Sequence, residues 1–125
     1  MPVKQKTIIV VEDEQYAAEM FAEMMRLSGF RVLKTAGSGQ AMSMIDKEEP
    51  AAVMLDIMMP DNSGLEVLRY MRREPKLAKI PIVMVSAKSM PADIQTGLEA
   101  GAPLYLTKPV GYLDLKDTLE KVLGA

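Results

Sequence analysis

Several side chains that can do chemistry stand directly after short apolar runs of strand-like composition. The acids are Glu12, Asp13 and Glu14 after residues 7–11 and Asp56 after residues 52–55; Ser86 follows residues 82–85, and Lys108 follows residues 104–107. Carboxylates that gather in one place repel one another, and a cation relieves this repulsion. Oxygen ligands favour a hard cation. A coordination shell in which water and phosphate complete a few protein ligands is typical of Mg²⁺, and Mn²⁺ and Ca²⁺ are the alternatives.

This set of residues also contains the parts that phosphoryl transfer needs: a nucleophile, a divalent ion and fixed groups that contact the phosphoryl oxygens. Asp56 is the candidate nucleophile, because a carboxylate can form an acyl phosphate. Glu12 and Asp13 can hold the metal. Ser86 can donate a hydrogen bond to one phosphoryl oxygen, and Lys108 can pair with another.

The elements that must position these residues alternate along the chain between β-branched runs and segments with helical spacing of apolar residues. The expected strands are Thr7–Val11, Arg31–Thr35, Ala52–Leu55, Ile82–Val85 and Leu104–Thr107. The expected helices are Gln15–Ser28, Ser38–Glu49, Leu65–Arg73, Pro91–Gly101 and Tyr112–Leu123. In the first helix the apolar residues at helical spacing are Ala17, Met20, Phe21, Met24 and Leu27. Gly29 and Pro50 stand where the first two helices should end.

Strands that alternate with helices must run parallel, with right-handed crossovers and helices on both faces. We therefore expect an α/β fold, a (βα)₅ flavodoxin-like doubly wound parallel sheet with strand order 2-1-3-4-5. The less apolar Arg31–Thr35 suits an edge. In such a sheet ligands bind at the carboxyl ends of the strands, which is where the candidate residues stand.

Composition excludes several other chemistries. The chain of 125 residues has 49% hydrophobic residues and a net charge of −2, so we expect one globular domain, 1–125, that does not bind nucleic acid directly. It has no Cys and no His, which excludes disulfides, Cys or His metal sites and Ser-His catalysis. A phosphohistidine donor must therefore lie on another protein. No apolar run is long enough for a membrane span or a signal peptide, so we expect a cytoplasmic location.

Four segments together resemble the successive motifs of response-regulator receiver domains, in particular the chemotaxis-type single-domain receivers of two-component signalling. They are IIVVEDE (8–14), VMLDIMMPDNSG (53–64), IVMVSAK (82–88) and LYLTKPV (104–110). The resemblance implies that Asp56 is the phosphoacceptor. It implies that Asp13, Asp56 and the backbone carbonyl of Met58 bind Mg²⁺ directly and that Glu12 acts mainly through water. It further implies that Ser86 and Lys108 contact the phosphoryl group and that Ser86 and Tyr105 form the switch.

What the resemblance implies for function is a phosphorylation-controlled signalling switch. A sensor histidine kinase, a phosphotransfer protein or a small phosphodonor would phosphorylate Asp56. The face formed by residues 91–101, 104–107 and 112–123 would then change its affinity for an output protein or output domain. The protein would not be an enzyme for other substrates, because it would catalyse only its own phosphorylation and slow dephosphorylation. Two departures from the common pattern are Glu12 in place of Asp and Ser86 in place of Thr.

Two further hypotheses differ from this one in testable ways. A pseudo-receiver would bind proteins without phosphorylation, and it would be expected to lack Asp56, Lys108 or the acidic pair, all of which are present. A flavin carrier on the same fold would need a phosphate-binding loop after the first strand, where this chain has the acidic sequence EDEQ. The sequence leaves open whether the chain is a free-standing receiver or part of a longer protein.

Overall fold

The computed structural model describes residues 5–56, 63–86, 104–107 and 110–123. The strands are β1 (Thr7–Val11), β2 (Arg31–Thr35), β3 (Ala52–Asp56), β4 (Ile82–Ser86) and β5 (Leu104–Thr107). The helices are α1 (Gln15–Leu27), α2 (Ser38–Glu48), α3 (Ser63–Arg73) and α5 (Tyr112–Leu123). The helix expected over Pro91–Gly101 lies outside the described residues.

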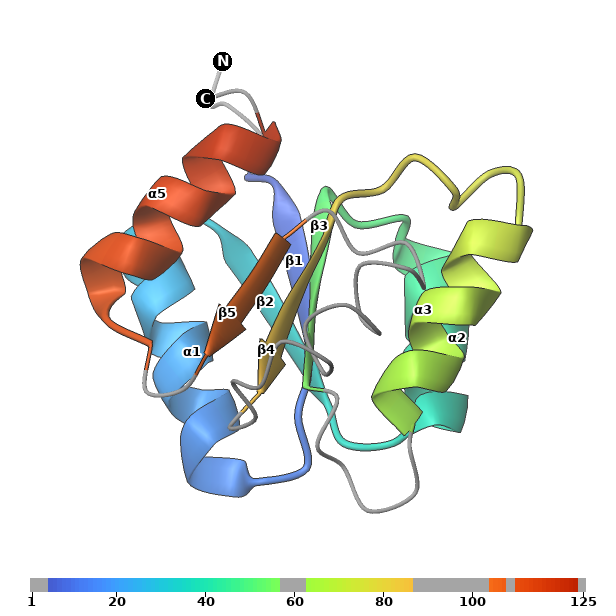
Figure 1. Ribbon diagram of the computed structural model, residues 1–125, viewed down its shortest axis with the longest axis horizontal. Coiled ribbons are helices and arrows are strands. Elements are labelled where there is room, and N and C mark those ends of the chain that lie inside the picture. The colour runs from blue at the N-terminus through green and yellow to red at the C-terminus, as the bar shows by residue number, and fades with distance from the viewer. Residues whose placement is uncertain (1–4, 57–62, 87–103, 108–109, 124–125) are drawn as a thin grey trace.

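The described strands form one parallel sheet in the order β2-β1-β3-β4-β5, as expected. The sheet lies between two layers of helices, with α1 and α5 on one face and α2 and α3 on the other (Figure 1). β2 is at the edge, where its alternation of buried and exposed residues fits. β3 and β4 are each one residue longer than expected, because Asp56 pairs with Val85 and Ser86 pairs with Thr107.

Each face of the sheet has its own hydrophobic core, and β1 contributes to both. Ile9 and Val11 pack in the cluster that includes residues of α2 and α3, whereas Ile8 and Val10 pack in the cluster that includes residues of α1 and α5. Successive strand residues point to opposite faces, so a strand covered on both sides must be apolar throughout. This explains why the four buried residues of β1, 8–11, are a continuous run of Ile and Val.

The buried face of α1 shares only Phe21 with the apolar residues that the sequence places at helical spacing. Ala18, Phe21, Ala22 and Met25 are buried. Met20 is 43% exposed and Leu27 is 71% exposed. The buried face of α1 thus combines two alanines with the larger Phe21 and Met25, whereas Met20 and Leu27 remain on the outer surface.

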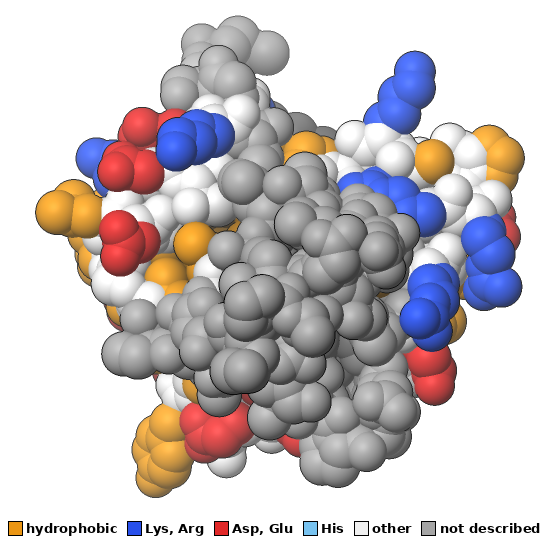
Figure 2. All heavy atoms as spheres, viewed as in Figure 1, with side chains coloured by type: hydrophobic (Ala, Val, Ile, Leu, Met, Phe, Trp, Pro, Cys, Tyr) orange, Lys and Arg blue, Asp and Glu red, His pale blue; other side chains and the backbone are white. Residues whose placement is uncertain are grey.

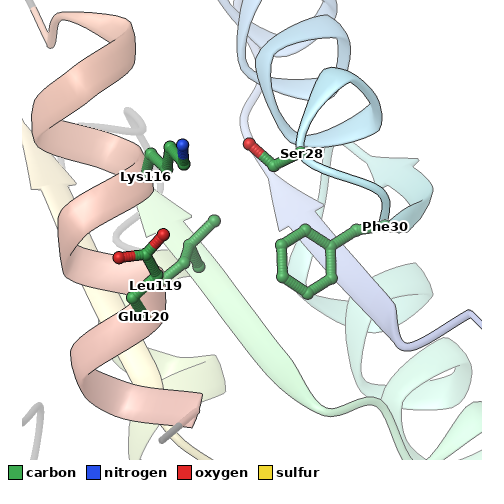
Figure 3. Close-up of a pocket in the computed structure, with 5 residues that line it drawn as sticks. All are labelled: Ser28, Phe30, Lys116, Leu119 and Glu120. Atoms are coloured by element: carbon green, nitrogen blue, oxygen red, sulfur yellow. The ribbon is translucent and has the colours of Figure 1, made fainter. Parts of the chain in front are cut away.

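The contact between α1 and α5 is incomplete at one end. A cavity of about 130 Å³ lies there, with Phe30 and Leu119 pointing into it from opposite sides (Figure 3). Beside it, the hydroxyl groups of Ser28 and Tyr112 lie 3.4 Å apart and connect the two helices. Of the helices that the structure describes, none is long and apolar enough to cross a membrane.

Candidate functional site

The strand register brings the ends of β1 and β3 side by side. Val11 pairs with Leu55, so Glu12 and Asp56, the next residue in each chain segment, emerge next to each other at the carboxyl edge of the sheet. The backbone N–H of Glu12 also donates to the carbonyl of Thr35 at 3.0 Å, which fixes Glu12 against the edge strand. Both acids therefore stand on backbone that is held by neighbouring strands.

Glu12, Asp13 and Asp56 form an acidic cluster whose ligand oxygens all lie within 4.8 Å of one another. Only 3% of Glu12 and 5% of Asp56 are exposed to solvent, whereas Asp13 is exposed. Burying carboxylates near one another is unfavourable unless a cation or hydrogen-bond donors compensate the charge. Oxygens alone, in this number and spacing, suit a hard divalent cation that completes its shell with water.

Glu14, the third acid in the run, has a different task. Its side chain accepts hydrogen bonds from the backbone N–H of Tyr16 at 3.1 Å and of Ala17 at 2.6 Å, and it caps the start of α1. Its own N–H lies 3.3 Å from Oε2 of Glu12 and donates to it. The backbone N–H of Glu14 thus holds the side chain of Glu12, while the carboxylate of Glu14 accepts from free N–H groups at the start of α1.

A cavity of about 370 Å³ adjoins the acidic cluster. It is lined by Glu12, Asp13, Gln15, Ala18, Lys34, Thr35, Ala36 and Gln40. The lining residues come from the end of β1, the start of α1, the end of β2 and the start of α2. The volume far exceeds that of an ion, so the cavity has room for the water that a hard cation keeps.

The remaining predicted site residues are described only in part. Ser86 ends β4, one residue beyond the partner of Asp56, so its backbone stands at the same edge of the sheet as the acidic cluster. Tyr105 lies in β5, where it pairs with Met84. Lys108 and Met58 lie outside the described residues. The structure therefore brings three of the predicted site residues together as side chains and a fourth, Ser86, as backbone.

A comparison with known protein families decides what this arrangement is. The model of the response regulator receiver domain matches residues 8–120. The chain belongs to this family.

Individual receiver proteins are similar to the chain to different extents. The phosphate regulon transcriptional regulatory protein PhoB of Pseudomonas aeruginosa is 36% identical over 118 residues, which cover 94% of this chain and 52% of PhoB. The chain thus spans about half the length of that relative. A putative response regulator from Chloroflexus aurantiacus is 30% identical, with a TM-score of 0.92 over 98% of this chain and 100% of the other.

A third similar protein was solved with a bound metal ion. It is the receiver domain of a sensor histidine kinase from Pseudomonas aeruginosa, with a magnesium ion coordinated in its active-site cleft. It is 26% identical to this chain, with a TM-score of 0.89 over 98% of this chain and 100% of the other.

In this receiver domain a positively charged side chain, that of Lys34, also lies beside the acidic cluster. Lys34 lines the cavity and forms an ion pair with Glu19 of α1. A hydrogen bond from Lys34 lowers the pKa of the exposed Glu19 carboxyl, and a hydrogen bond from Arg26 lowers it further. Since Lys34 is engaged with Glu19, it joins β2 to α1 at the border of the cavity.

Four polar residues of the cavity escaped prediction from the sequence: Gln15, Lys34, Thr35 and Gln40. Thr35 is only 5% exposed, and its hydroxyl donates to Oε1 of Gln40 at 2.9 Å. A threonine at the end of a strand and a glutamine in a first helical turn are ordinary in a sequence. The available signal was that Thr35 ends the strand next to the one that precedes Glu12.

Proposed function

We propose that residues 1–125 form one receiver domain that acts as a phosphorylation-controlled signalling switch, with Asp56 as the phosphoacceptor and Mg²⁺ as the required ion. The observation that carries the proposal is the acidic cluster of Glu12, Asp13 and Asp56, with its oxygens within 4.8 Å of one another. Its position at the carboxyl edge of a doubly wound parallel sheet is the usual position for a ligand site.

The donor set fits Mg²⁺. Asp13 and Asp56 would hold the ion directly, together with the backbone carbonyl of Met58, and Glu12 would act mainly through water. The ion would neutralise charge on the cluster and on phosphoryl oxygens. The magnesium in the similar Pseudomonas receiver domain supports this choice. Mn²⁺ and Ca²⁺ are the alternative ions, since both accept oxygen ligands.

In the proposed reaction an Asp56 carboxylate oxygen attacks phosphorus and the bond from phosphorus to the donor's leaving group breaks. The electron pair of that bond goes to the leaving group, which is a histidine nitrogen of a kinase or phosphotransfer protein, or the carboxylate of a small acyl phosphate. Ser86 and Lys108 contact the phosphoryl oxygens. Hydrolysis of the acyl phosphate later restores Asp56, so the domain modifies only itself and is not an enzyme for other substrates.

The outer surface of α1 supports docking of a protein donor close to Asp56. Tyr16, Met20 and Leu27 are 85%, 43% and 71% exposed, and hydrophobic side chains are visible on the side of α1 and α5 in Figure 2. These residues recur at helical spacing on the surface opposite the buried face, and they form an exposed apolar stripe. The stripe begins three residues after Asp13, so a protein that covers it lies near the acidic cluster.

The proposed output runs through the switch residues Ser86 and Tyr105. Phosphorylation would draw the Ser86 hydroxyl toward the new phosphoryl group, and the Tyr105 ring would turn into the space left beside β4. The face of residues 91–101, β5 and α5 would then bind an output protein or output domain with changed affinity. Because kinases and small acyl phosphates that could serve as donors act in the cytoplasm, the proposal includes a cytoplasmic location.

The test is phosphorylation with acetyl phosphate and Mg²⁺, followed by intact mass spectrometry. The parent should gain one phosphate that hydroxylamine removes, as it removes an acyl phosphate. Asp56→Asn should gain none, and Asp117→Asn, at an exposed acid of α5, should behave like the parent. A stable phosphate on Asp56→Asn would place the acceptor elsewhere. A folded parent that binds Mg²⁺ and takes no phosphate from acetyl phosphate or a histidine kinase would favour the pseudo-receiver.

A further inference from the structure

The cavity beside the acidic cluster contains more polar groups than metal binding by carboxylates requires. Besides Glu12 and Asp13, its lining includes Gln40 and Thr35, which come from α2 and β2. At about 30 Å³ per water molecule, a volume of about 370 Å³ corresponds to on the order of ten waters. Mg²⁺ binds with several waters, so polar groups on this lining are positioned to contact its hydration shell.

Thr35 links the acidic cluster to Gln40 by two separate hydrogen bonds. Its carbonyl accepts from the backbone N–H of Glu12 at 3.0 Å, and its hydroxyl donates to Oε1 of Gln40 at 2.9 Å. Thr35 is buried, which shields its hydroxyl from bulk water, whereas Gln40 is exposed and the bond between the two side chains is only partly buried. The side-chain bond sets the orientation of the Gln40 amide relative to the backbone that carries Glu12.

The chemistry of an amide suits this place. Once Oε1 of Gln40 accepts from Thr35, the two N–H groups of Nε2 remain as donors. Ionised carboxylates only accept hydrogen bonds, and each metal-bound carboxylate keeps lone pairs that the ion does not use. Gln40 lines the same cavity as Glu12 and Asp13, so its Nε2 can donate to cavity water that also contacts these acids, while Thr35 holds Oε1.

We propose that Gln40, oriented by Thr35, is a positioning residue that sets the Mg²⁺ affinity of the acidic cluster. This inference rests on the proposed function, because it needs the metal site formed by Glu12, Asp13 and Asp56. Groups that hydrogen-bond to metal ligands contribute strongly to the affinity for the metal, since they fix the orientation of the ligands before the ion binds. Gln40 acts on the acids and their water, and it is not a ligand of the ion.

The experiment measures Mg²⁺ affinity of the full chain by chemical-shift titration of backbone amides. Thr35→Val removes the hydroxyl and keeps the backbone bond to Glu12, while Thr35→Ser keeps both. Gln40→Met removes the amide at similar length. Thr118→Val is the matched control, because Thr118 is also a buried threonine, 8% exposed, in α5. Asp13→Asn serves as the reference for a lost ligand.

Thr35→Val and Gln40→Met should each weaken Mg²⁺ binding by about tenfold, the lower end of the effect of groups that support metal ligands. The double variant should be little weaker than either single one, because both remove the same interaction. Thr35→Ser should retain affinity within about twofold, and Thr118→Val should match the parent. A purely structural role would lower the melting temperature without this pattern in metal affinity.

Some results would overturn the inference alone, and another would overturn the proposed metal site as well. If the parent binds Mg²⁺, Asp13→Asn loses binding, and the folded Thr35→Val and Gln40→Met variants bind as the parent does, Gln40 has no positioning role and the proposed function stands. Independent, additive losses in the double variant would count equally against the coupling. If the parent itself shows no Mg²⁺-dependent shifts at residues of the cluster, the proposed metal site fails together with the inference.

Discussion

Oε2 of Glu14 accepts a hydrogen bond from the backbone N–H of Ala17 at 2.6 Å, and this bond closes the first turn of α1. The bond connects the acidic run to the helix that follows it. It also shows that adjacent acids can have unrelated roles, since Asp13 belongs to the acidic cluster and Glu14 does not.

Glu14→Ala should therefore destabilise the protein without removing the metal site. Loss of the cap leaves the N–H groups of Tyr16 and Ala17 without their side-chain acceptor, which typically costs about 1 kcal/mol of the free energy of unfolding. Chemical denaturation would measure it. Mg²⁺ affinity should stay within about twofold of the parent, because Glu14 is not a ligand. Glu23→Ala, at an exposed position inside α1, is the control and should change stability by less than about 0.5 kcal/mol. A tenfold loss of Mg²⁺ affinity in Glu14→Ala would assign its carboxylate to the metal.

Met20→Glu should distinguish protein donors from small ones. A charge in the middle of the apolar stripe of α1 should slow phosphoryl transfer from a histidine kinase that phosphorylates the parent, by about tenfold or more. The rate with acetyl phosphate should not change, because a small donor needs no helix surface. Radiolabel transfer and intact mass would give the two rates. Lys47→Glu, an exposed change on α2 across the sheet, should leave both rates unchanged. Equal slowing with both donors would mean that Met20→Glu disturbs the site itself.

Ser86→Ala should separate phosphorylation from switching. Asp56 should still accept phosphate from acetyl phosphate, because Mg²⁺ and the acids remain. The Tyr105 ring should keep its unphosphorylated environment, since the charge-assisted hydrogen bond that favours the active state, worth about 1.5–3 kcal/mol, is missing. Ring resonances of Tyr105 with and without beryllium fluoride would report it. Ser86→Thr, which keeps the hydroxyl, should switch as the parent does. A ring that responds equally in Ser86→Ala would show that the switch runs through other residues.

Glu49→Gly should stabilise the protein. Glu49 ends α2 with φ of 44°, in the left-handed region, where a side chain is strained and glycine is not. The expected gain is about 0.5–1 kcal/mol, after the greater flexibility of glycine in the unfolded chain is subtracted. Gly29→Ala is the converse change: Gly29 has φ of 96°, and apart from its chain neighbours no atom lies within 4 Å of the added Cβ, so a loss of stability reports backbone strain and no side-chain clash. Thermal unfolding of both variants would measure this. A destabilised Glu49→Gly would indicate that contacts of the Glu49 side chain outweigh its strain.

The alternation of apolar runs and helical segments was enough to predict the fold. Each strand run is bounded by residues that end it, and a parallel sheet collects the residues that follow its strands at one edge. This is why Glu12, Asp13 and Asp56 could be assigned to one site before their distances were known, and the acidic cluster confirms that they meet. The roles of these three acids as metal ligands and phosphoacceptor stay predictions, as do those of Ser86, Lys108, Met58 and Tyr105.

Only the tertiary structure decided how residues of similar type divide their tasks. The sequence shows three consecutive acids but does not show that the third, Glu14, caps α1, because the direction of each side chain depends on where the backbone turns into the helix. It does not show that Ala18 and Ala22 are buried while Met20 and Leu27 face outward, since only one face of α1 packs on the sheet and the orientation of the helix selects that face. The contact from Thr35 to Gln40 depends on the turn between β2 and α2, which brings together residues with no motif between them. Local pattern predicts the elements and the edge where they meet, whereas burial and backbone direction determine which side chains act there.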